Sequence, residues 1–289
     1  MTTDHERVVA EIAQEVIARL FAPRDGAPAP VRRPIPMPPM GATRPAAPAA
    51  VPERKRSPIG HGVFATVDEA VKAAARAQER VAAMSLDERG RMIAIIRRLC
   101  DERAEELGRA ELDETRIGRL DHKIAKLRAM RYVLGVEAMR SDARSDASGL
   151  CVIERAPWGV IGMVLPATHS VPTMVSNAIN ILAAGNTAVF SPHPAGARIA
   201  ARALALFNVE IENAMGVANV ITTVAEPSIK SAEEIFHHPG VALLCVTGGG
   251  AVVKAAAQSG KRVIAGGPGN PPAVVDDPVS YTHLTLPTN

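Results

Sequence analysis

The chain has 289 residues, 47% of them apolar, which suffices for the core of one or two domains. Its formal net charge is +3, but residues 22–60 hold seven Lys or Arg and two acidic residues, leaving 26 basic and 28 acidic residues elsewhere. This balance argues against a nucleic-acid-binding surface on the folded part. No run of about 18 apolar residues occurs, so we expect no membrane span. Glu11, Glu15 and Arg19 interrupt the apolar residues of the N-terminus, so we expect no secretory signal and a cytoplasmic location.

Residues 1–21 predict an amphipathic helix. Thr3 and Glu6 form a capping box at its start. One stripe of the helix carries its apolar residues, Val9, Ile12, Ala13, Val16 and Leu20. Such a segment is either a docking peptide or a detached piece of the core. We favour docking, because residues 22–60 hold eleven of the 23 prolines and predict an extended linker.

Residues 66–139 predict helices. Thr66 with Glu69 and Ser85 with Glu88 are two further capping boxes. Helical spacing of apolar residues follows in two groups: Met92, Ile93, Ile96, Leu99, Cys100 and Leu107, then Ile117, Leu120, Ile124, Leu127 and Leu134. We interpret the many charges between them as solvated faces.

From Gly159 the pattern changes to short apolar runs separated by helical segments. The runs are GVIGMVLP, NTAVFSP, NVITTV, ALLCVTG and RVIAGG. Runs this apolar are typical of strands buried on both faces, so the fold class is α/β with a doubly wound parallel sheet. The three cysteines, Cys100, Cys151 and Cys245, show neither CxxC spacing nor a His cluster, so we expect no disulfide framework and no metal site.

Ligands of such sheets bind beyond the carboxyl ends of the strands. Thr168 and His169 follow the first run, and Ser191 and His193 follow the second. We interpret each histidine as a hydrogen-bonding loop residue rather than a base. The Thr247–Gly250 turn before a helix is either an ordinary tight turn or a nucleotide-binding loop, whose glycines would let the backbone approach a phosphate.

Four motifs in this order carry a family resemblance: APWGVIGMVLP, LAAGNTAVFSPHP, VTGGG and GPGNPP. From about Val63 to Asp277 the chain resembles the aldehyde dehydrogenase superfamily, and specifically the coenzyme A-acylating branch of bacterial microcompartments for ethanolamine or propanediol breakdown. The resemblance implies a Rossmann-type cofactor domain. Residues 1–21 resemble the encapsulation peptides that direct such enzymes into a microcompartment shell, so the implied location is the microcompartment lumen and the implied partner of residues 3–21 is a shell protein.

The resemblance also implies site residues. Thr168 stands at the place of the oxyanion-hole asparagine of hydrolytic relatives. Ser191 replaces a lysine that binds the cofactor ribose, so the choice between NAD and NADP stays open. The other cofactor-binding positions are Thr247, Gly248 and Gly249 near the pyrophosphate and nicotinamide, and Ala225, Glu226 and Pro227 near the adenine. The family also usually forms homo-oligomers.

The place of the general base of hydrolytic relatives is filled by Ala265 or Gly266, neither of which can accept a proton. This favours release of the acyl group to coenzyme A, because a thiol attacks without a strong base. The nucleophilic cysteine of the family would lie beyond the GNPP strand. None of the three cysteines replaces it, so we expect this chain to be inactive and poorly soluble.

The last residues, PVSYTHLTLPTN, match neither a strand, a helix nor the family pattern. The expected organisation is a docking helix (1–21), a linker (22–60), a helical segment with the dinucleotide-binding domain (61–265), the start of a catalytic domain (266–277) and a non-native tail (278–289). The leading hypothesis is the front part of an enzyme that converts a short aliphatic aldehyde, coenzyme A and NAD(P)+ into acyl-CoA. The alternatives are a non-catalytic nucleotide- or shell-binding remnant and a different NAD-dependent reductase.

Overall fold

The computed structural model describes residues 59–267 and 269. The predicted docking helix, nearly all of the linker and the predicted non-native tail lie outside these residues, as does most of the expected start of the catalytic domain. The described residues belong to one compact unit.

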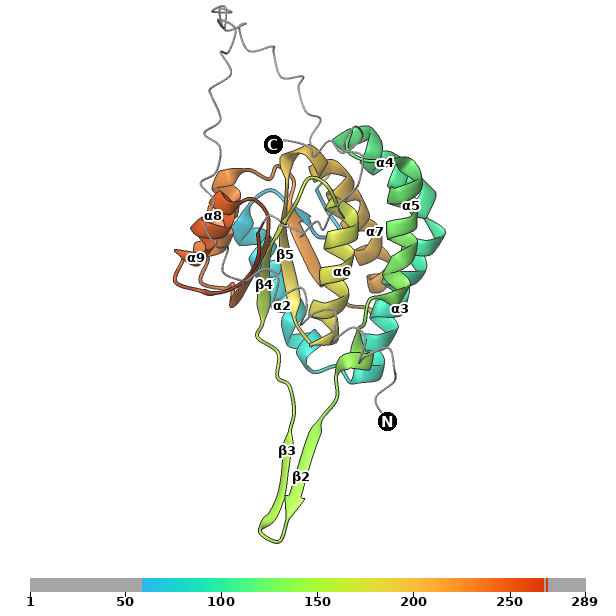
Figure 1. Cartoon of the computed structure of the whole chain (residues 1–289). Coiled ribbons are helices and arrows are strands. Elements are labelled where there is room, and N and C mark those ends of the chain that lie inside the picture. The colour runs from blue at the N-terminus through green and yellow to red at the C-terminus, as the bar shows by residue number, and fades with distance from the viewer. Residues whose placement is uncertain (1–58, 268, 270–289) are drawn as a thin grey trace, which may run out of the picture. The chain divides into compact units, whose positions relative to one another are not determined.

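A six-stranded parallel sheet forms the centre of this unit (Figure 1). Its strand order is β1-β6-β5-β4-β7-β8. The strands are β1 (Val63–Phe64), β4 (Val160–Leu165), β5 (Thr187–Pro192), β6 (Ile221–Val224), β7 (Leu243–Thr247) and β8 (Arg262–Gly266). Helices cross over between successive strands from β4 to β8, as the alternating pattern predicts.

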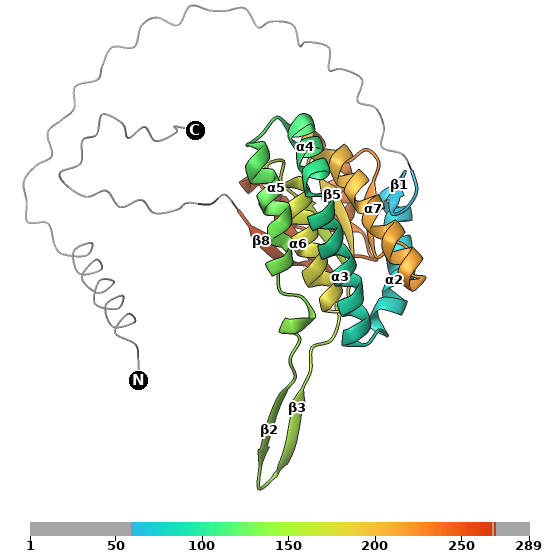
Figure 2. The ribbon, with the colours of Figure 1, turned by 90° about the vertical axis from the view of Figure 1, so that its right-hand side faces the viewer.

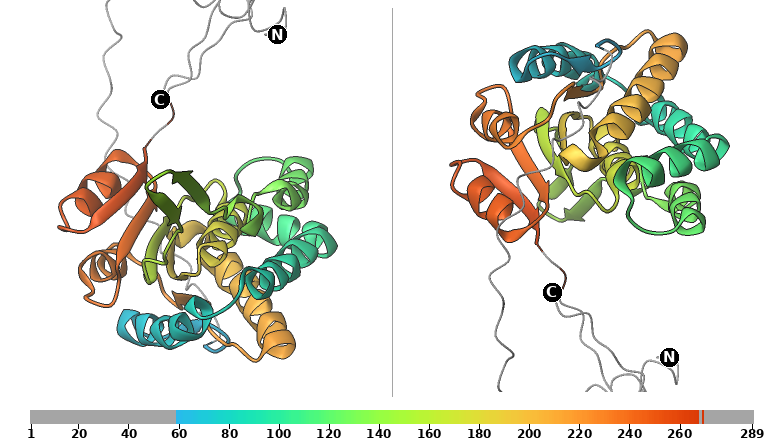
Figure 3. Two further views of the ribbon diagram at one scale, coloured as in Figure 1. Left: turned by 90° about the horizontal axis from the view of Figure 1, so that it is seen from below. Right: turned by 90° about the horizontal axis from the view of Figure 1, so that it is seen from above.

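Helices lie on both faces of the sheet, as Figure 3 shows from two sides. One face carries α2 (Val67–Ala82), α8 (Ile229–His237) and α9 (Gly250–Ala257). The other carries α6 (Ser170–Ala183) and α7 (Ala197–Met215), over which α3 (Leu86–Glu102), α4 (Ala104–Thr115) and α5 (Leu120–Arg128) pack as an outer layer (Figure 2). Within residues 59–267 we find no helix that has both the length and the apolar character to cross a membrane. The predicted doubly wound α/β class is confirmed.

Strand β5 shows why its sequence is apolar without alternation. Ala188 and Phe190 pack into the core on the α6 side, whereas Val189 packs into the core on the α2 side. On that second side the Thr187 hydroxyl donates to the Ala74 carbonyl oxygen of α2 at 3.0 Å. Both faces are therefore buried, which requires apolar or internally hydrogen-bonded side chains at every position.

The predicted capping boxes are confirmed at the starts of α2 and α3. The Thr66 hydroxyl accepts from the Glu69 amide at 3.3 Å, and the Glu69 carboxylate accepts from the Thr66 amide at 3.1 Å. Ser85 and Glu88 make the same reciprocal pair at 3.2 and 2.8 Å. Each box satisfies backbone donors that the helix itself cannot pair.

The predicted helical run from Ile117 to Leu134 is wrong at both ends. Ile117 lies between α4 and α5, because α4 closes with Arg116 in the left-handed conformation at φ 57°. Helix α5 ends at Arg128 and passes into two short 3-10 helices, η1 (Ala129–Tyr132) and η2 (Val136–Ala138). Leu134 lies between these and is 64% exposed.

An antiparallel hairpin of β2 (Asp142–Asp146) and β3 (Gly149–Ile153) was not predicted. It extends away from the sheet (Figure 2) and is exposed along both strands, so burial imposes no apolar alternation on its sequence. Asp146 and Gly149 are residue types typical of turns. In the turn of this hairpin the Asp146 carboxylate accepts from the Ser148 amide at 2.7 Å, and Gly149 has a φ of +146°. Cys151 therefore lies in a strand of this hairpin.

Candidate functional site

The loops that follow the parallel strands gather at one side of the sheet, which we call the carboxyl edge. It lies opposite the hairpin, which enters β4 from the other end of the strands (Figure 1). The predicted site residues lie in or next to these loops: Thr168 after β4, Ser191 at the end of β5, Ala225, Glu226 and Pro227 after β6, and Thr247, Gly248 and Gly249 at the end of β7. The fold thus brings to one edge of the sheet residues that lie up to about 80 positions apart in the sequence.

The turn from β7 into α9 offers backbone donors. Thr247 is the last residue of β7, and Gly249 is the N-cap of α9, with no side chain capping the helix. The first amides of α9 have no partner within the helix, as at any helix start. A Cβ atom built on Gly249 or Gly250 would meet no atom within 4 Å. The turn at residues 247–250, which we call the glycine cradle, is therefore open to an approaching anionic group.

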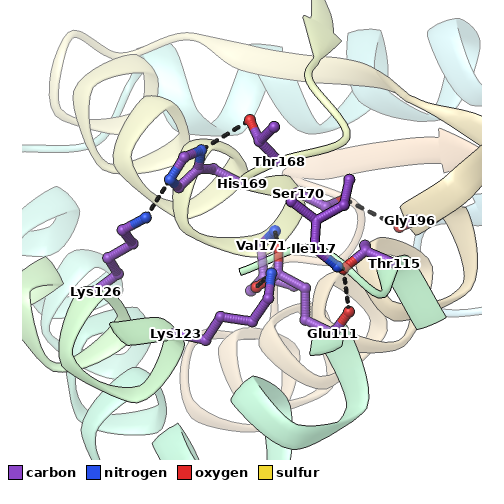
Figure 4. A network of polar contacts seen from close by, with 10 residues as sticks. All are labelled: Glu111, Thr115, Ile117, Lys123, Lys126, Thr168, His169, Ser170, Val171 and Gly196. Atoms are coloured by element: carbon purple, nitrogen blue, oxygen red, sulfur yellow. Dashed lines mark hydrogen bonds and ion pairs between the residues drawn. The ribbon is translucent and has the colours of Figure 1, made fainter. Parts of the chain in front are cut away.

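Thr168 and His169 occupy the loop between β4 and α6, with His169 as the N-cap of α6. The Thr168 side chain is exposed, and its Oγ1 lies 2.9 Å from His169 Nδ1. The other ring nitrogen, Nε2, contacts the Lys126 ammonium of α5 (Figure 4). Burial lowers the pKa of His169 below its usual 6.5, and the nearby charges of Lys126 and Lys123 lower it further. Both effects favour the neutral ring.

A buried ion pair between Glu111 and Lys123 contacts the start of α6, next to this loop. Glu111 of α4 is fully buried and accepts from the Val171 amide in the first turn of α6 at 3.3 Å. Its second carboxylate oxygen lies 3.5 Å from the Lys123 ammonium of α5. The interpretation of all helix charges as solvated is wrong here, because each of these two charges is buried against the other. The Ser170 hydroxyl, which donates to the Gly196 carbonyl at 3.0 Å, ties the same helix start to the loop after β5.

The remaining predicted cofactor positions are placed as follows. Ser191 lies inside β5, one residue before its end, and is buried. Ala225, Glu226 and Pro227 connect β6 to α8, and the Ala225 amide donates to the Phe64 carbonyl oxygen of β1 at 2.8 Å. His193 accepts from the Ala195 amide through Nδ1 at 3.1 Å, as expected of a hydrogen-bonding loop residue.

Ala265 and Gly266 form the end of β8, beside Val246 and Thr247 of β7. The Gly266 carbonyl oxygen accepts from the Gly248 amide at 3.3 Å, which joins this strand end to the glycine cradle. Neither residue carries a side chain able to take a proton. The end of β8 therefore supplies no general base to the carboxyl edge.

None of the three cysteine thiols lies in the loops of the carboxyl edge. Cys100 is buried on α3, where burial raises its pKa to about 12. Cys245 is in the middle of β7, paired with Met163, and burial raises its pKa as well. Cys151 is exposed, but it lies in the hairpin beyond the opposite end of the strands. A reactive thiolate next to Thr168 is not available within this chain.

Three charged residues of this region were missed by sequence reasoning: Glu111, Lys123 and Lys126. They lie on α4 and α5, outside the alternating segment that carries the other site residues. Their spacing resembles that of any exposed helix face, and only the packing of these helices against α6 shows their role.

The sequence profile of the aldehyde dehydrogenase family matches residues 56–283. The chain belongs to the aldehyde dehydrogenase family. Among its relatives, the acetylating acetaldehyde dehydrogenase EutE of Salmonella typhimurium is 44% identical over 75% of this chain and 46% of its own length. The CoA-propanoylating propanal dehydrogenase of the same organism is 35% identical over 76% of this chain and 48% of its own length.

Solved structures agree with this membership. A propionaldehyde dehydrogenase from the fucose utilisation bacterial microcompartment of Clostridium phytofermentans superposes with a TM-score of 0.72 at 39% identity, covering 73% of this chain and 49% of that one. The Rhodopseudomonas palustris propionaldehyde dehydrogenase with bound propionyl-CoA gives 0.71 at 39% identity, covering 74% and 48%. This aldehyde dehydrogenase chain thus spans about half the length of the relatives that it matches.

Proposed function

We propose that the carboxyl edge binds NAD or NADP, with the pyrophosphate at the turn formed by Thr247, Gly248 and Gly249. The open backbone of Gly249 and Gly250, next to the uncapped start of α9, is the observation that carries this proposal. Ser191, which is buried one residue before the end of β5, would lie near the ribose, and the loop at residues 225–227 would lie near the adenine. Bound there, the nicotinamide supplies a hydride acceptor.

We further propose that the whole protein oxidises a short aliphatic aldehyde and transfers the acyl group to coenzyme A, so that aldehyde, coenzyme A and NAD(P)+ give acyl-CoA, NAD(P)H and a proton. Two observations support coenzyme A over water as the acceptor. Ala265 and Gly266 leave the end of β8 without a general base, and the relatives described above include enzymes named as acetylating or CoA-propanoylating. In this reaction Thr168 would donate a hydrogen bond to the oxygen of the reacting carbonyl.

This chain by itself is expected to bind the dinucleotide without turning over aldehyde. The positions of Cys100, Cys151 and Cys245 carry this expectation, because none of the three thiols lies beside Thr168. The same observation favours the second candidate function, a non-catalytic nucleotide- or shell-binding protein of a microcompartment.

The binding proposal is tested by titrating the full chain with NAD+ and with NADP+ in a calorimeter. Gly249 has φ −67° and ψ 163°, which any residue adopts, so Gly249→Val should fold normally while its side chain fills the cradle. We expect the wild-type protein to bind NAD+, NADP+ or both. The variant should bind the same dinucleotide at least about tenfold more weakly, a loss of about 1.4 kcal/mol in binding free energy. Equal affinities for both proteins would refute the site.

A second assay separates the two candidate functions. Formation of NADH is followed with acetaldehyde or propanal, with and without coenzyme A. Dinucleotide binding without NADH formation is the result expected of this chain. Formation of NADH that depends on both aldehyde and coenzyme A would show that the chain holds a nucleophile that the positions of its cysteines do not provide.

We also infer that the protein works in a microcompartment lumen, with residues 3–21 bound to a shell protein, and that it self-associates. The amphipathic pattern and the proline-rich segment after it support this inference, as does the microcompartment origin of the Clostridium phytofermentans structure. Co-sedimentation with purified shell proteins should require residues 1–21. Equal co-sedimentation of a chain lacking them would contradict the inference, and analytical ultracentrifugation would measure self-association.

A further inference from the structure

Lys126, His169 and Thr168 form a continuous chain of polar contacts at the carboxyl edge (Figure 4). The Lys126 ammonium contacts Nε2 of His169, and Nδ1 of the same ring lies 2.9 Å from Thr168 Oγ1. The three residues come from α5 and from the loop before α6, so the packing of α5 against α6 brings them together.

The direction of hydrogen bonding along this chain follows from the donors available. An ammonium group has three donors and no acceptor, so the Nε2 that contacts Lys126 must accept. A neutral imidazole carries one proton, which then resides on Nδ1. The Nδ1–H group then donates to Thr168 Oγ1, so the hydroxyl oxygen of Thr168 acts as the acceptor. The Thr168 hydroxyl hydrogen is left to point away from His169.

We propose that Lys126 and His169 are positioning residues that fix the Thr168 hydroxyl as a hydrogen-bond donor toward a carbonyl or oxyanion oxygen bound at the carboxyl edge. This inference rests on the proposed function of that edge, because it gives Thr168 a ligand there. Consecutive hydrogen bonds polarise one another, so in the series Lys126–His169–Thr168 the Lys126 ammonium makes the Thr168 hydroxyl a stronger donor. The exposed Thr168 side chain leaves room for the ligand oxygen.

The surrounding charges keep the ring in the required state. Lys126 and Lys123 of α5 face it with positive charge, and the carboxylate of Glu111 from α4 is paired with Lys123. A second proton on His169 would place a cation against the Lys126 ammonium, and the lowered pKa of the ring agrees with this repulsion. The hydrogen bond from Lys126 to His169 therefore forms only at pH values above the pKa of His169. Protonation of Nε2 in acid breaks it.

The test is long-range nitrogen NMR of the histidine rings in the full chain, with His169→Gln to assign the signal. We expect His169 in the Nδ1-protonated form. Lys126→Met removes the ammonium, so the ring should lose that preference and its pKa should rise toward 6.5. Lys126→Arg retains a cationic donor and should preserve both properties. Arg128→Met, which removes an exposed charge of the same helix paired with Glu105, is the matched control and should change neither.

An Nε2-protonated His169 in the wild-type protein would overturn the proposal, as would an unchanged tautomer and pKa in Lys126→Met. The dinucleotide titration described above separates this result from a failure of the proposed function. Binding at the glycine cradle with an Nε2-protonated ring refutes only the positioning series. An Nδ1-protonated ring in a chain that binds no dinucleotide supports the series and refutes the proposed dinucleotide site.

Discussion

Replacing Glu111 should destabilise the protein more than replacing any exposed acidic residue of the same helices. Glu111 is fully buried, and the Lys123 side chain that faces it is only 5% exposed. Glu111→Ala leaves the Lys123 ammonium buried without its counter-charge and removes the acceptor of the Val171 amide. Breaking a buried pair in this way costs about 3–5 kcal/mol. That loss is a large fraction of the roughly 5–15 kcal/mol that stabilises a typical domain.

A double-mutant cycle isolates the pairing. Glu111→Gln keeps an oxygen for the Val171 amide but removes the negative charge, and Lys123→Met removes the positive charge while keeping most of the side-chain volume. Because the double variant leaves no unpaired buried charge, it should be more stable than the sum of the single losses predicts, by about 0.5–3 kcal/mol. The energy of the pair is thus separated from the loss of packing.

The assay is urea unfolding of the full chain at pH 7, followed by circular dichroism. The exposed pair of Lys230 and Glu234, 4.0 Å apart on α8, is the control, and Glu234→Gln should give no measurable loss. A loss below about 1 kcal/mol in Glu111→Ala, or additive single losses in the cycle, would refute the assignment of Glu111 and Lys123 as a stabilising buried pair.

Four further predictions concern stability and thiol chemistry. Ser85→Ala removes the cap of α3 and should cost about 1 kcal/mol in urea unfolding. Phe190→Ala, at a fully buried position of β5, should cost about 3–5 kcal/mol, and a loss below about 1 kcal/mol would contradict the described packing. Burial raises the pKa of Cys100 from its usual 9.0 to about 12, so the unfolded chain loses this proton at lower pH than the folded chain does. Stability should therefore fall above pH 9 in wild type and less steeply in Cys100→Val. Iodoacetamide should label the exposed Cys151 before Cys100, which mass spectrometry of the folded protein measures.

The parallel sheet and its crossover helices were predictable because burial on both faces leaves a direct trace in the sequence. The runs around Val189 and Leu244 are apolar at nearly every position, and their strands are covered on both sides. Capping boxes such as that of Ser85 are equally local, since both partners lie within one helical turn. The hairpin around Gly149 left no such trace, because neither of its faces is buried in this unit.

The positions of the candidate site residues were predictable only where those residues follow or end a strand. Thr168, Ser191 and Thr247 each end or follow a recognisable apolar run, so the rule for parallel sheets places them together. Lys126 and Glu111 reach the same region from helices of the outer layer. Their positions depend on how α4 and α5 pack against α6, a long-range result of folding that no local pattern encodes.

The measurement that tests the account most directly is a crystal structure of the full chain grown with NAD+ or NADP+. The account predicts the dinucleotide across the carboxyl edge, with its pyrophosphate against the backbone amides at Gly249 and Gly250 and its nicotinamide toward Thr168. A dinucleotide bound on any other surface, or a carboxylate from elsewhere in the chain occupying the glycine cradle, would contradict it.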